Sequence, residues 1–336
     1  MENIARHNHY NPCFWTAFWN PEYYSSALFP STRLNPRDQA VYVLNVKSNK
    51  IYQTNVDNVH YDKDIGMAEI SLDSAKRFCK KYHPNYYKEF CRNSKEDQYP
   101  IFLDFEDILK GLEGLPAYKT LLNVIKSSHI VSIMEKTFLA AFVYIQAIRS
   151  HAIMNSVLEW NTKIGIEKFE YIYLLKWSLA NRDYLAQQLD PLIFSKWHLY
   201  STVTDSFPLT DSPVLINSES IMIAFSPRLL LEIRLNEPTI NDIVEIKEGI
   251  EQAKLDEFRQ RTIGNTFREI IFGDKKLLIE WQVTKEFSQR VDTIQKMDGY
   301  NILAARHKGR ELWHLNAHGN QKFQPVTTKR KRHRKQ

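Results

Sequence analysis

The order of apolar and polar positions divides the chain into strand-like and helix-like blocks. Short apolar runs that end at turn residues or Ser-Pro pairs predict strands. Proline cannot donate to a β-ladder and favours extended geometry in the residue before it, so Ser212-Pro213 and Ser226-Pro227 mark strand edges or turns. The predicted strands are Ala40–Val46, Lys50–Asn55, Trp197–Val203, Ile221–Phe225, Leu229–Leu235, Lys276–Val283 and Gly309–Leu315.

One long helical block dominates the rest of the pattern. Ser132 can cap a helix over Ser132–Trp160, Glu135 stands at capping-box spacing, and neither glycine nor proline interrupts the block. Its middle is apolar nearly all round, which is typical of a buried helix. The other predicted helices are Asp73–Phe90 with Ser71 as N-cap, Phe105–Gly111, and Asn241–Gln260 continuing to Phe267. Separate helical and strand blocks predict an α+β fold, helix-rich, with a long buried central helix on a mainly antiparallel sheet.

Composition predicts a soluble protein of the reducing cytoplasm. With 336 residues, 43% of them hydrophobic and 25% charged, the chain has ample material for a core. The most apolar run, Phe138–Ile148, is too short to span a bilayer, so no membrane partner is expected. Three cysteines without a CxxC pair indicate neither a zinc ribbon nor a disulfide framework. We expect one α+β domain over residues 1–327, followed by a disordered basic tail over residues 328–336.

The tail holds the whole net charge of +6. Six of the 45 Lys and Arg residues lie in it, which leaves 39 against 39 acidic residues elsewhere. A run of like charges repels itself and can bind polyanions by releasing counterions. The tail is therefore either a solubilising segment or a sequence-independent nucleic-acid contact. The residues concerned are Lys329, Arg330, Lys331, Arg332, Arg334 and Lys335.

A polar corner between apolar runs carries the best candidate chemistry. Asp211 and Ser212 lie within the stretch Phe207–Leu215, at a predicted strand end. Arg149 ends the apolar helix and shares a face with Gln146, because residues three apart are helix neighbours. A buried guanidinium needs an anion, and Asp211 is its natural partner. The pair is either a tie between helix and sheet or a ligand-facing site.

Near the N-terminus, His9 can be an ordinary hydrogen-bonded residue or a proton-transfer group beside Asp211, because imidazole titrates near neutrality. On a strand, His7 and His9 would point to one face, so a metal ion bound by both is the third possible role. Tyr10 is expected to fix the backbone or contact a substrate. Ser212 lacks the Gly-x-Ser-x-Gly surroundings of a nucleophile.

In order along the chain, four motifs resemble a bacterial family known as domain of unknown function 4238. They are His9-Tyr10-Asn11-Pro12-Cys13-Phe14, Gln146-Ala147-Ile148-Arg149, Thr210-Asp211-Ser212-Pro213-Val214 and Phe225-Ser226-Pro227. Ser150-His151 stands where the family usually has Thr-Pro, and Asn11 where it usually has an aliphatic residue. The resemblance spans about residues 6–270 and implies a shared fold and polar cluster. It implies no reaction.

Two classes of function remain open. The first is a binding or scaffold module with a fixed polar cluster and a tail that contacts nucleic acid. The second is a hydrolase of a phosphate-containing or nucleic-acid substrate. The catalytic candidates are His9, Arg149 and Asp211, and the substrate-binding candidates are Tyr10, Gln146 and Ser212. No metal-ligand set is assigned, and the sequence leaves cofactors and protein partners unknown.

Overall fold

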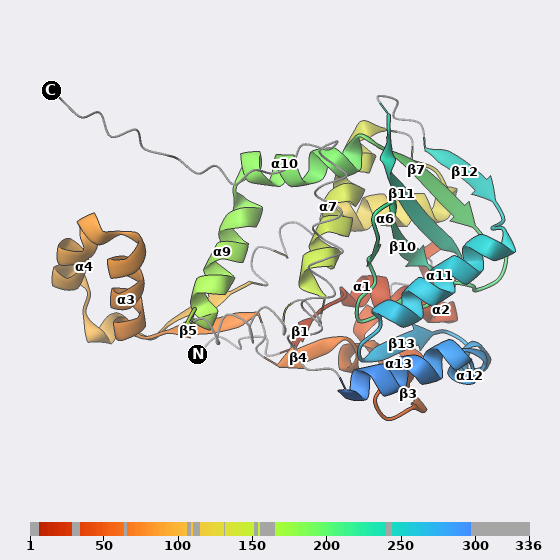
Figure 1. The fold of residues 1–336 in the computed structure, drawn as a ribbon, viewed down its shortest axis with the longest axis horizontal. Coiled ribbons are helices and arrows are strands. Elements are labelled where there is room, and N and C mark those ends of the chain that lie inside the picture. Colours follow the sequence, from red (N-terminus) through yellow and green to blue (C-terminus); the bar gives the residue numbers. More distant parts are fainter. Residues whose placement is uncertain are drawn as a thin grey trace, which may run out of the picture.

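A computed structural model describes residues 7–28, 34–63, 66–105, 109, 115–130, 132–150, 154, 165–239 and 244–296. The described chain has an α+β fold, as the sequence predicts (Figure 1). The helices of four or more residues are α1 (Cys13–Thr16), α2 (Pro21–Leu28), α3 (Leu72–Tyr82), α4 (Tyr87–Asn93), α6 (Leu115–Ser127), α7 (Ile133–Arg149), α9 (Lys168–Ala180), α10 (Arg182–Ile193), α11 (Gln252–Asn265), α12 (Lys275–Gln282) and α13 (Lys285–Lys296).

The larger sheet has five strands in the order β12-β7-β11-β10-β9. They are β7 (Ser195–Ser201), β9 (Leu215–Ile216), β10 (Ser220–Ser226), β11 (Leu229–Pro238) and β12 (Glu245–Glu248). Neighbouring strands are antiparallel except β12 and β7, which are parallel. Ile221 of β10 pairs with Ile233 of β11, which in turn pairs with Trp197 of β7. Large apolar side chains therefore lie side by side on one face of the sheet.

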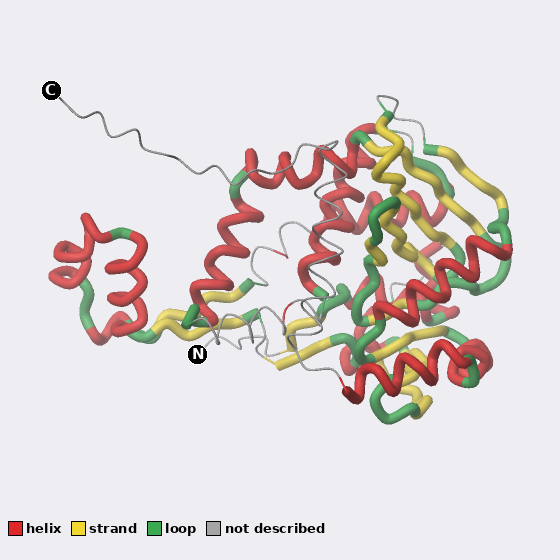
Figure 2. The backbone as a smooth tube through the Cα atoms, viewed as in Figure 1, coloured by secondary structure: helices red, strands yellow, loops and turns green. Residues whose placement is uncertain are grey.

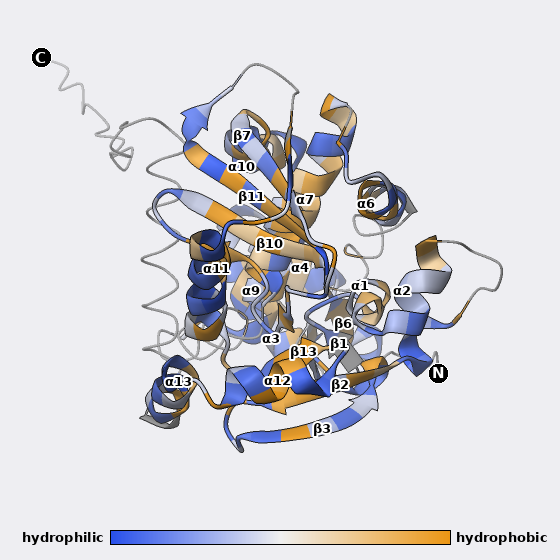
Figure 3. Ribbon diagram, turned by 90° about the vertical axis from the view of Figure 1, so that its right-hand side faces the viewer, coloured by the Kyte–Doolittle hydropathy of each residue, from blue (hydrophilic) through white to orange (hydrophobic). Residues whose placement is uncertain are grey.

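Helix α7 packs on that apolar face. Its Phe142 ring lies edge-on to Phe225 of β10 at a centroid distance of 6.5 Å. Lys136 lies over the Trp197 ring and donates to the Ser195 carbonyl at 3.0 Å. Strand β10 and helix α7 are mostly hydrophobic in Figure 3, whereas α11, on the other side of the sheet, is mostly hydrophilic. The helix is thus the buried central element that the apolar pattern predicts.

The second sheet has four strands in the order β3-β2-β13-β8. They are β2 (Ala40–Asn45), β3 (Lys50–Asn55), β8 (Leu209–Thr210) and β13 (Glu269–Phe272). The N-terminal segment ties the two sheets together, because Trp15 Nε1 donates to the Phe225 carbonyl at 3.1 Å and Trp19 Nε1 donates to the Phe207 carbonyl at 2.8 Å. A short ribbon of β1 (His7–His9) and β4 (Tyr61–Lys63) runs beside them.

A helical hairpin projects from the body. Helices α3 and α4 lie at the end of the ribbon formed by β5 (Met67–Ile70) and β6 (Ile101–Asp104), at the left of Figures 1 and 2. Helix α9 lies beside this ribbon and forms side-chain hydrogen bonds with α3. Arg77 donates to Glu167 at 2.9 Å, and Lys81 and Tyr82 both donate to Glu170, at 3.0 and 2.7 Å. These contacts fix one face of the hairpin.

Two predicted helices are shorter than expected. The block over Asp73–Phe90 is two helices, because Pro84 begins a separate 3₁₀ turn after His83, whose φ of −132° ends α3. Helix α7 begins at the predicted Ser132 cap but ends at Arg149, because Ser150 takes an extended ψ of 146°. The prediction for Phe105–Gly111 lies mostly outside the described residues.

Two other predictions have the wrong type. Within the predicted helix from Asn241, residues 245–248 form strand β12 instead, because their backbone groups hydrogen-bond to the edge of β7. The described helix of this block is α11. The predicted strand Lys276–Val283 is helix α12, which Asp274 caps by accepting from Lys276 N at 2.8 Å. The predicted strand Gly309–Leu315 and the basic tail lie outside the described residues. No described helix is long and apolar enough to cross a membrane.

Candidate functional site

At the ends of β8 and β13, a buried carboxylate joins two loops. Asp211 is 0% exposed, and its Oδ1 accepts from the backbone N–H groups of Phe267, Arg268 and Glu269 at 3.2, 3.2 and 3.3 Å. Its own N–H donates to the Glu269 carbonyl at 3.2 Å. The carboxylate therefore acts as a cap for the chain entering β13.

The described hydrogen bonds of Asp211 do not include the predicted partner Arg149. Among the described residues, Oδ1 of the Asp211 carboxylate is bonded to the backbone of residues 267–269 and Oδ2 has no hydrogen-bond partner, while the carboxylate also interacts electrostatically with Arg290 of α13. Burial lowers the pKa of the Arg290 guanidinium, and the negative charge of Asp211 partly offsets this effect. The described contacts thus stabilise Asp211 from the β13 side, and its pairing with Arg149 stays a prediction.

A chain of buried polar contacts connects this corner to the N-terminal segment. Asn11 Nδ2 donates to the Thr210 carbonyl at 2.9 Å and lies 2.7 Å from His60 Nδ1. The His60 N–H donates to Glu269 Oε2 at 3.1 Å. Ser212 is 0% exposed, so the residue predicted to bind substrate has no access to solvent in this conformation. These contacts fix the backbone around Asp211.

Tyr10 belongs to the same polar network. Its hydroxyl donates to Asp62, whose other oxygen accepts from Arg268 at 2.8 Å. Burial raises the pKa of the adjacent Glu269, while the positive charge of Arg268 lowers it. Tyr52 also donates to Glu269, at 3.2 Å. The predicted substrate contact is therefore a buried tyrosine with a carboxylate partner.

His9 lies at the edge of this network and has two distinct ring nitrogens. Its Nδ1 lies 3.2 Å from the Val59 carbonyl, and its Nε2 lies 3.5 Å from Asp57 Oδ1. Burial lowers the pKa of His9 to about 4; the Val59 bond and Asp57 oppose the shift, and Arg149 and Arg37 add to it. His9 is therefore neutral near pH 7, with its proton on Nδ1, because a carbonyl can only accept. A neutral imidazole of this low basicity is a poor general base.

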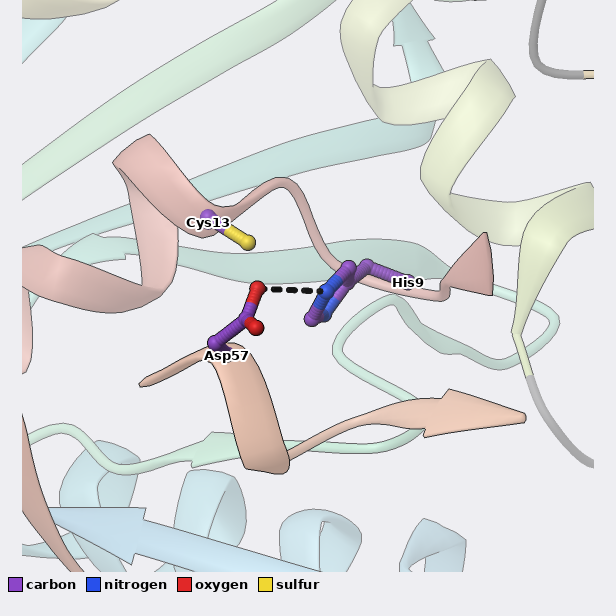
Figure 4. Close-up of side chains that lie close together, drawn as sticks. All are labelled: His9, Cys13 and Asp57. Atoms are coloured by element: carbon purple, nitrogen blue, oxygen red, sulfur yellow. Dashed lines mark ion pairs between the residues drawn. The ribbon is translucent and has the colours of Figure 1, made fainter. Parts of the chain in front are cut away.

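Two further side chains point toward the His9 ring in Figure 4, Cys13 from the start of α1 and Asp57 from the turn before β4. One ligand atom from each of the three residues lies within 4.8 Å of the others. Asp57 also accepts from Arg37 at 3.0 Å. Cys13 and Asp57 are the functional candidates that sequence reasoning missed. The spacing of Cys13 four residues after His9 was a weak signal, and nothing local pointed to Asp57.

Gln146 and Arg149 lie at the end of α7, and both are buried. Arg149 lies close enough to His9 to lower its pKa. The structure therefore brings His9 and Arg149 together, whereas Asp211 belongs to the β8–β13 corner. The three predicted catalytic residues do not form one directly bonded set among the described residues.

A second site lies on the α3–α4 hairpin. Residues 72–93 hold six Lys or Arg residues and two acidic residues, a net charge of +4. Arg77 and Lys81 are paired with α9, but Lys80, Lys88 and Arg92 are exposed and have no ion-pair partner among the described residues. The positive charge of the sequence is thus not confined to the tail, because the hairpin is basic and the remaining body is correspondingly acidic.

Aromatic side chains surround a hollow beside these cations. A cavity of about 710 Å³ lies between the hairpin, the β5–β6 ribbon and α9, and its lining is mostly apolar. Phe78, Phe90 and Phe169 line it, together with Tyr86 and Tyr173, which are 65% and 41% exposed. The hairpin therefore combines exposed charge with accessible rings.

Neither a family model nor a curated protein nor a solved structure matches this chain. The resemblance to the domain of unknown function 4238 family therefore stays a prediction, and no relative supplies an activity.

Proposed function

We propose that the protein is a binding module for single-stranded nucleic acid, with the α3–α4 hairpin as its contact surface. The observation that carries the proposal is the coincidence of a basic hairpin with exposed rings around one apolar hollow. Cations neutralise phosphates, and bases stack on aromatic side chains whatever the sequence. The basic residues 329–335 supply a second contact in this proposal.

The geometry supports the module better than the hydrolase alternative. A hydrolase that used His9, Arg149 and Asp211 would need all three at one open site. Asp211 is fully buried and engaged by three backbone donors, and the pKa of His9 is lowered to about 4. The polar cluster is therefore architectural in this proposal, and it holds the body on which the hairpin is displayed.

Binding of a fluorescently labelled oligothymidylate, followed by anisotropy over a salt series, tests the proposal. Replacing Lys80, Lys88 and Arg92 by Ala should lower the slope of log K against log salt by about 2, since each phosphate contact on a single strand contributes about 0.7. The matched control replaces three exposed lysines of α12 and α13 by Ala, Lys275, Lys276 and Lys285, at the opposite end of the molecule in Figure 1.

Stacking and the tail are tested separately. Tyr86→Ala and Tyr173→Ala should each weaken binding by about 1–3 kcal/mol without changing the salt slope, because stacking involves no counterions. Truncation after Thr328 removes the tail contact alone. Equal affinity of the hairpin and control triple variants would refute the hairpin as the contact surface.

A further inference from the structure

We propose that His9, Cys13 and Asp57 form a zinc site with one coordination position open to water. A ring nitrogen of His9, the Cys13 Sγ and an Asp57 carboxylate oxygen converge within 4.8 Å, from three different elements of the chain (Figure 4). Thiolate, imidazole and carboxylate together form a ligand set typical of Zn²⁺.

The orientation of the His9 ring is the strongest observation. His9 Nδ1–H donates to the Val59 carbonyl, which leaves a lone pair on Nε2. That nitrogen is buried without a hydrogen-bond partner, on a side chain that is only 7% exposed. It faces Asp57 Oδ1, which is also an acceptor, at 3.5 Å. Asp57 Oδ1 also accepts from Arg37 at 3.0 Å, but the Nε2 lone pair of His9 has no donor, and a metal ion held by both atoms would satisfy it.

The second ring nitrogen is arranged as in known metal sites. A ligating histidine nearly always donates its other N–H to a carbonyl or carboxylate, which fixes the tautomer. Val59 has this role for His9, and Arg37 holds the Asp57 carboxylate at 3.0 Å. The arrangement differs from a Cys-His-Asp proton relay, in which the carboxylate and the thiol occupy opposite nitrogens of the ring. Here the carboxylate lies at the nitrogen that a thiol would have to use.

One ligand separation already fits a metal, and all three ligand atoms lie within 4.8 Å of one another. In a tetrahedral zinc site, with bonds of about 2.0–2.3 Å, neighbouring ligand atoms lie about 3.3–3.6 Å apart. The separation of 3.5 Å between His9 Nε2 and Asp57 Oδ1 already has this value. Asp57 is 35% exposed, so solvent reaches one side of the cluster and a water can be the fourth ligand in this proposal. The charges of the Cys13 thiolate and the Asp57 carboxylate balance the ion, while Arg37 and Arg149 lie around it.

Cobalt substitution of the full-length chain without an affinity tag is the direct test. The protein is stripped with EDTA, dialysed and titrated with Co²⁺, which absorbs by thiolate charge transfer when sulfur binds and has intense visible bands when tetrahedral. We expect one equivalent of Co²⁺ to bind and to show both the thiolate charge-transfer band and the intense visible bands. Zn²⁺ should then displace it. A wild-type titration without the thiolate band overturns the proposal.

Variants locate the ion. Cys13→Ser should abolish the thiolate band, and Asp57→Asn should weaken zinc affinity more than about 100-fold, because loss of an outer-shell partner alone costs 10–100-fold. Cys91→Ser, which changes a cysteine of similar exposure on α4, and Asp38→Asn are the matched controls. Zinc should also raise the melting temperature of the wild type but not of Cys13→Ser. A band that survives Cys13→Ser and disappears in Cys91→Ser places the metal elsewhere and overturns the assignment.

Discussion

The β8–β13 corner and the α3–α4 hairpin differ in how their charged groups are satisfied. In the corner, the Asp211 carboxylate is fully buried and accepts three backbone hydrogen bonds. On the hairpin, Lys80, Lys88 and Arg92 are exposed to solvent. The three bonds to Oδ1 tie the loop before β13 to β8, so the corner stabilises the fold, although Oδ2 has no hydrogen-bond partner. Exposed charges contribute little stability and remain available to a partner.

The largest effect on stability is expected in the β8–β13 corner. Asp211→Ala removes the acceptor of three backbone N–H groups, and we expect a loss of at least about 3 kcal/mol, because each buried unsatisfied donor costs about 1–3 kcal/mol. Urea denaturation measures the loss. Asp211→Asn, which keeps one carbonyl oxygen, is the control and should retain most of the stability. A loss below about 1 kcal/mol for the alanine variant would contradict the structural role.

A double-mutant cycle tests which cation Asp211 interacts with. The losses of unfolding free energy caused by Asp211→Asn and Arg149→Ala should be additive to within about 0.5 kcal/mol, because no described contact joins these residues. The losses caused by Asp211→Asn and Arg290→Gln should not be additive, since Asp211 interacts electrostatically with Arg290. Strong coupling to Arg149 instead would restore the ion pair that the sequence predicted.

Gly273 tests the packing at the other end of β13, against the N-terminal segment. A Cβ atom there would clash with the Trp19 carbonyl oxygen, so Gly273→Ala should destabilise the fold by about 1–3 kcal/mol. Gly264→Ala is the matched control, because its Cβ would meet nothing within 4 Å and it lies in helix α11. Alanine is favoured over glycine in helices by about 1 kcal/mol, so the control should melt at a higher temperature.

The buried Glu269 should make stability depend on pH. Burial raises its folded pKa above the ordinary value of 4.5, so its favourable contribution is complete below that pH and is lost as pH rises through the folded pKa. Glu269→Gln has no carboxyl to ionise, so it should gain stability relative to the wild type across this window, by up to about 1.4 kcal/mol per pH unit. Urea denaturation from pH 4 to 8 measures the difference. Exposed Glu286→Gln is the control, and a difference between Glu269→Gln and the wild type that does not grow with pH would contradict the prediction.

The smallest effect on stability is expected on the hairpin. Reversing Lys88 and Arg92 to Glu should change the free energy of unfolding by less than about 0.5 kcal/mol, because both side chains are exposed. The same variant should lose most of its oligonucleotide affinity at low salt. A variant that unfolds readily would show that these cations stabilise the fold, and the contrast between the two regions would fail.

Local rules made much of the fold predictable. Apolar runs bounded by turn residues or Ser-Pro pairs identified β7, β10 and β11, and Ser132 with its capping-box partner Glu135 identified the start of α7. These signals act over a few residues, so a single sequence contains them. The same kind of signal was missed at Asp274, which caps α12 where a strand was predicted.

Distant pairings depended on the tertiary structure. The sequence by itself determined the α+β class, the buried character of α7 and the polar residues of the corner. Only the tertiary structure decided that Asp211 bonds to the backbone 56–58 residues later, and that Asp57 meets His9 beside Cys13. The reason is physical: burial requires each polar group to be bonded, but several partners satisfy that requirement equally well, and the packing of sheets and helices determines which of them is near.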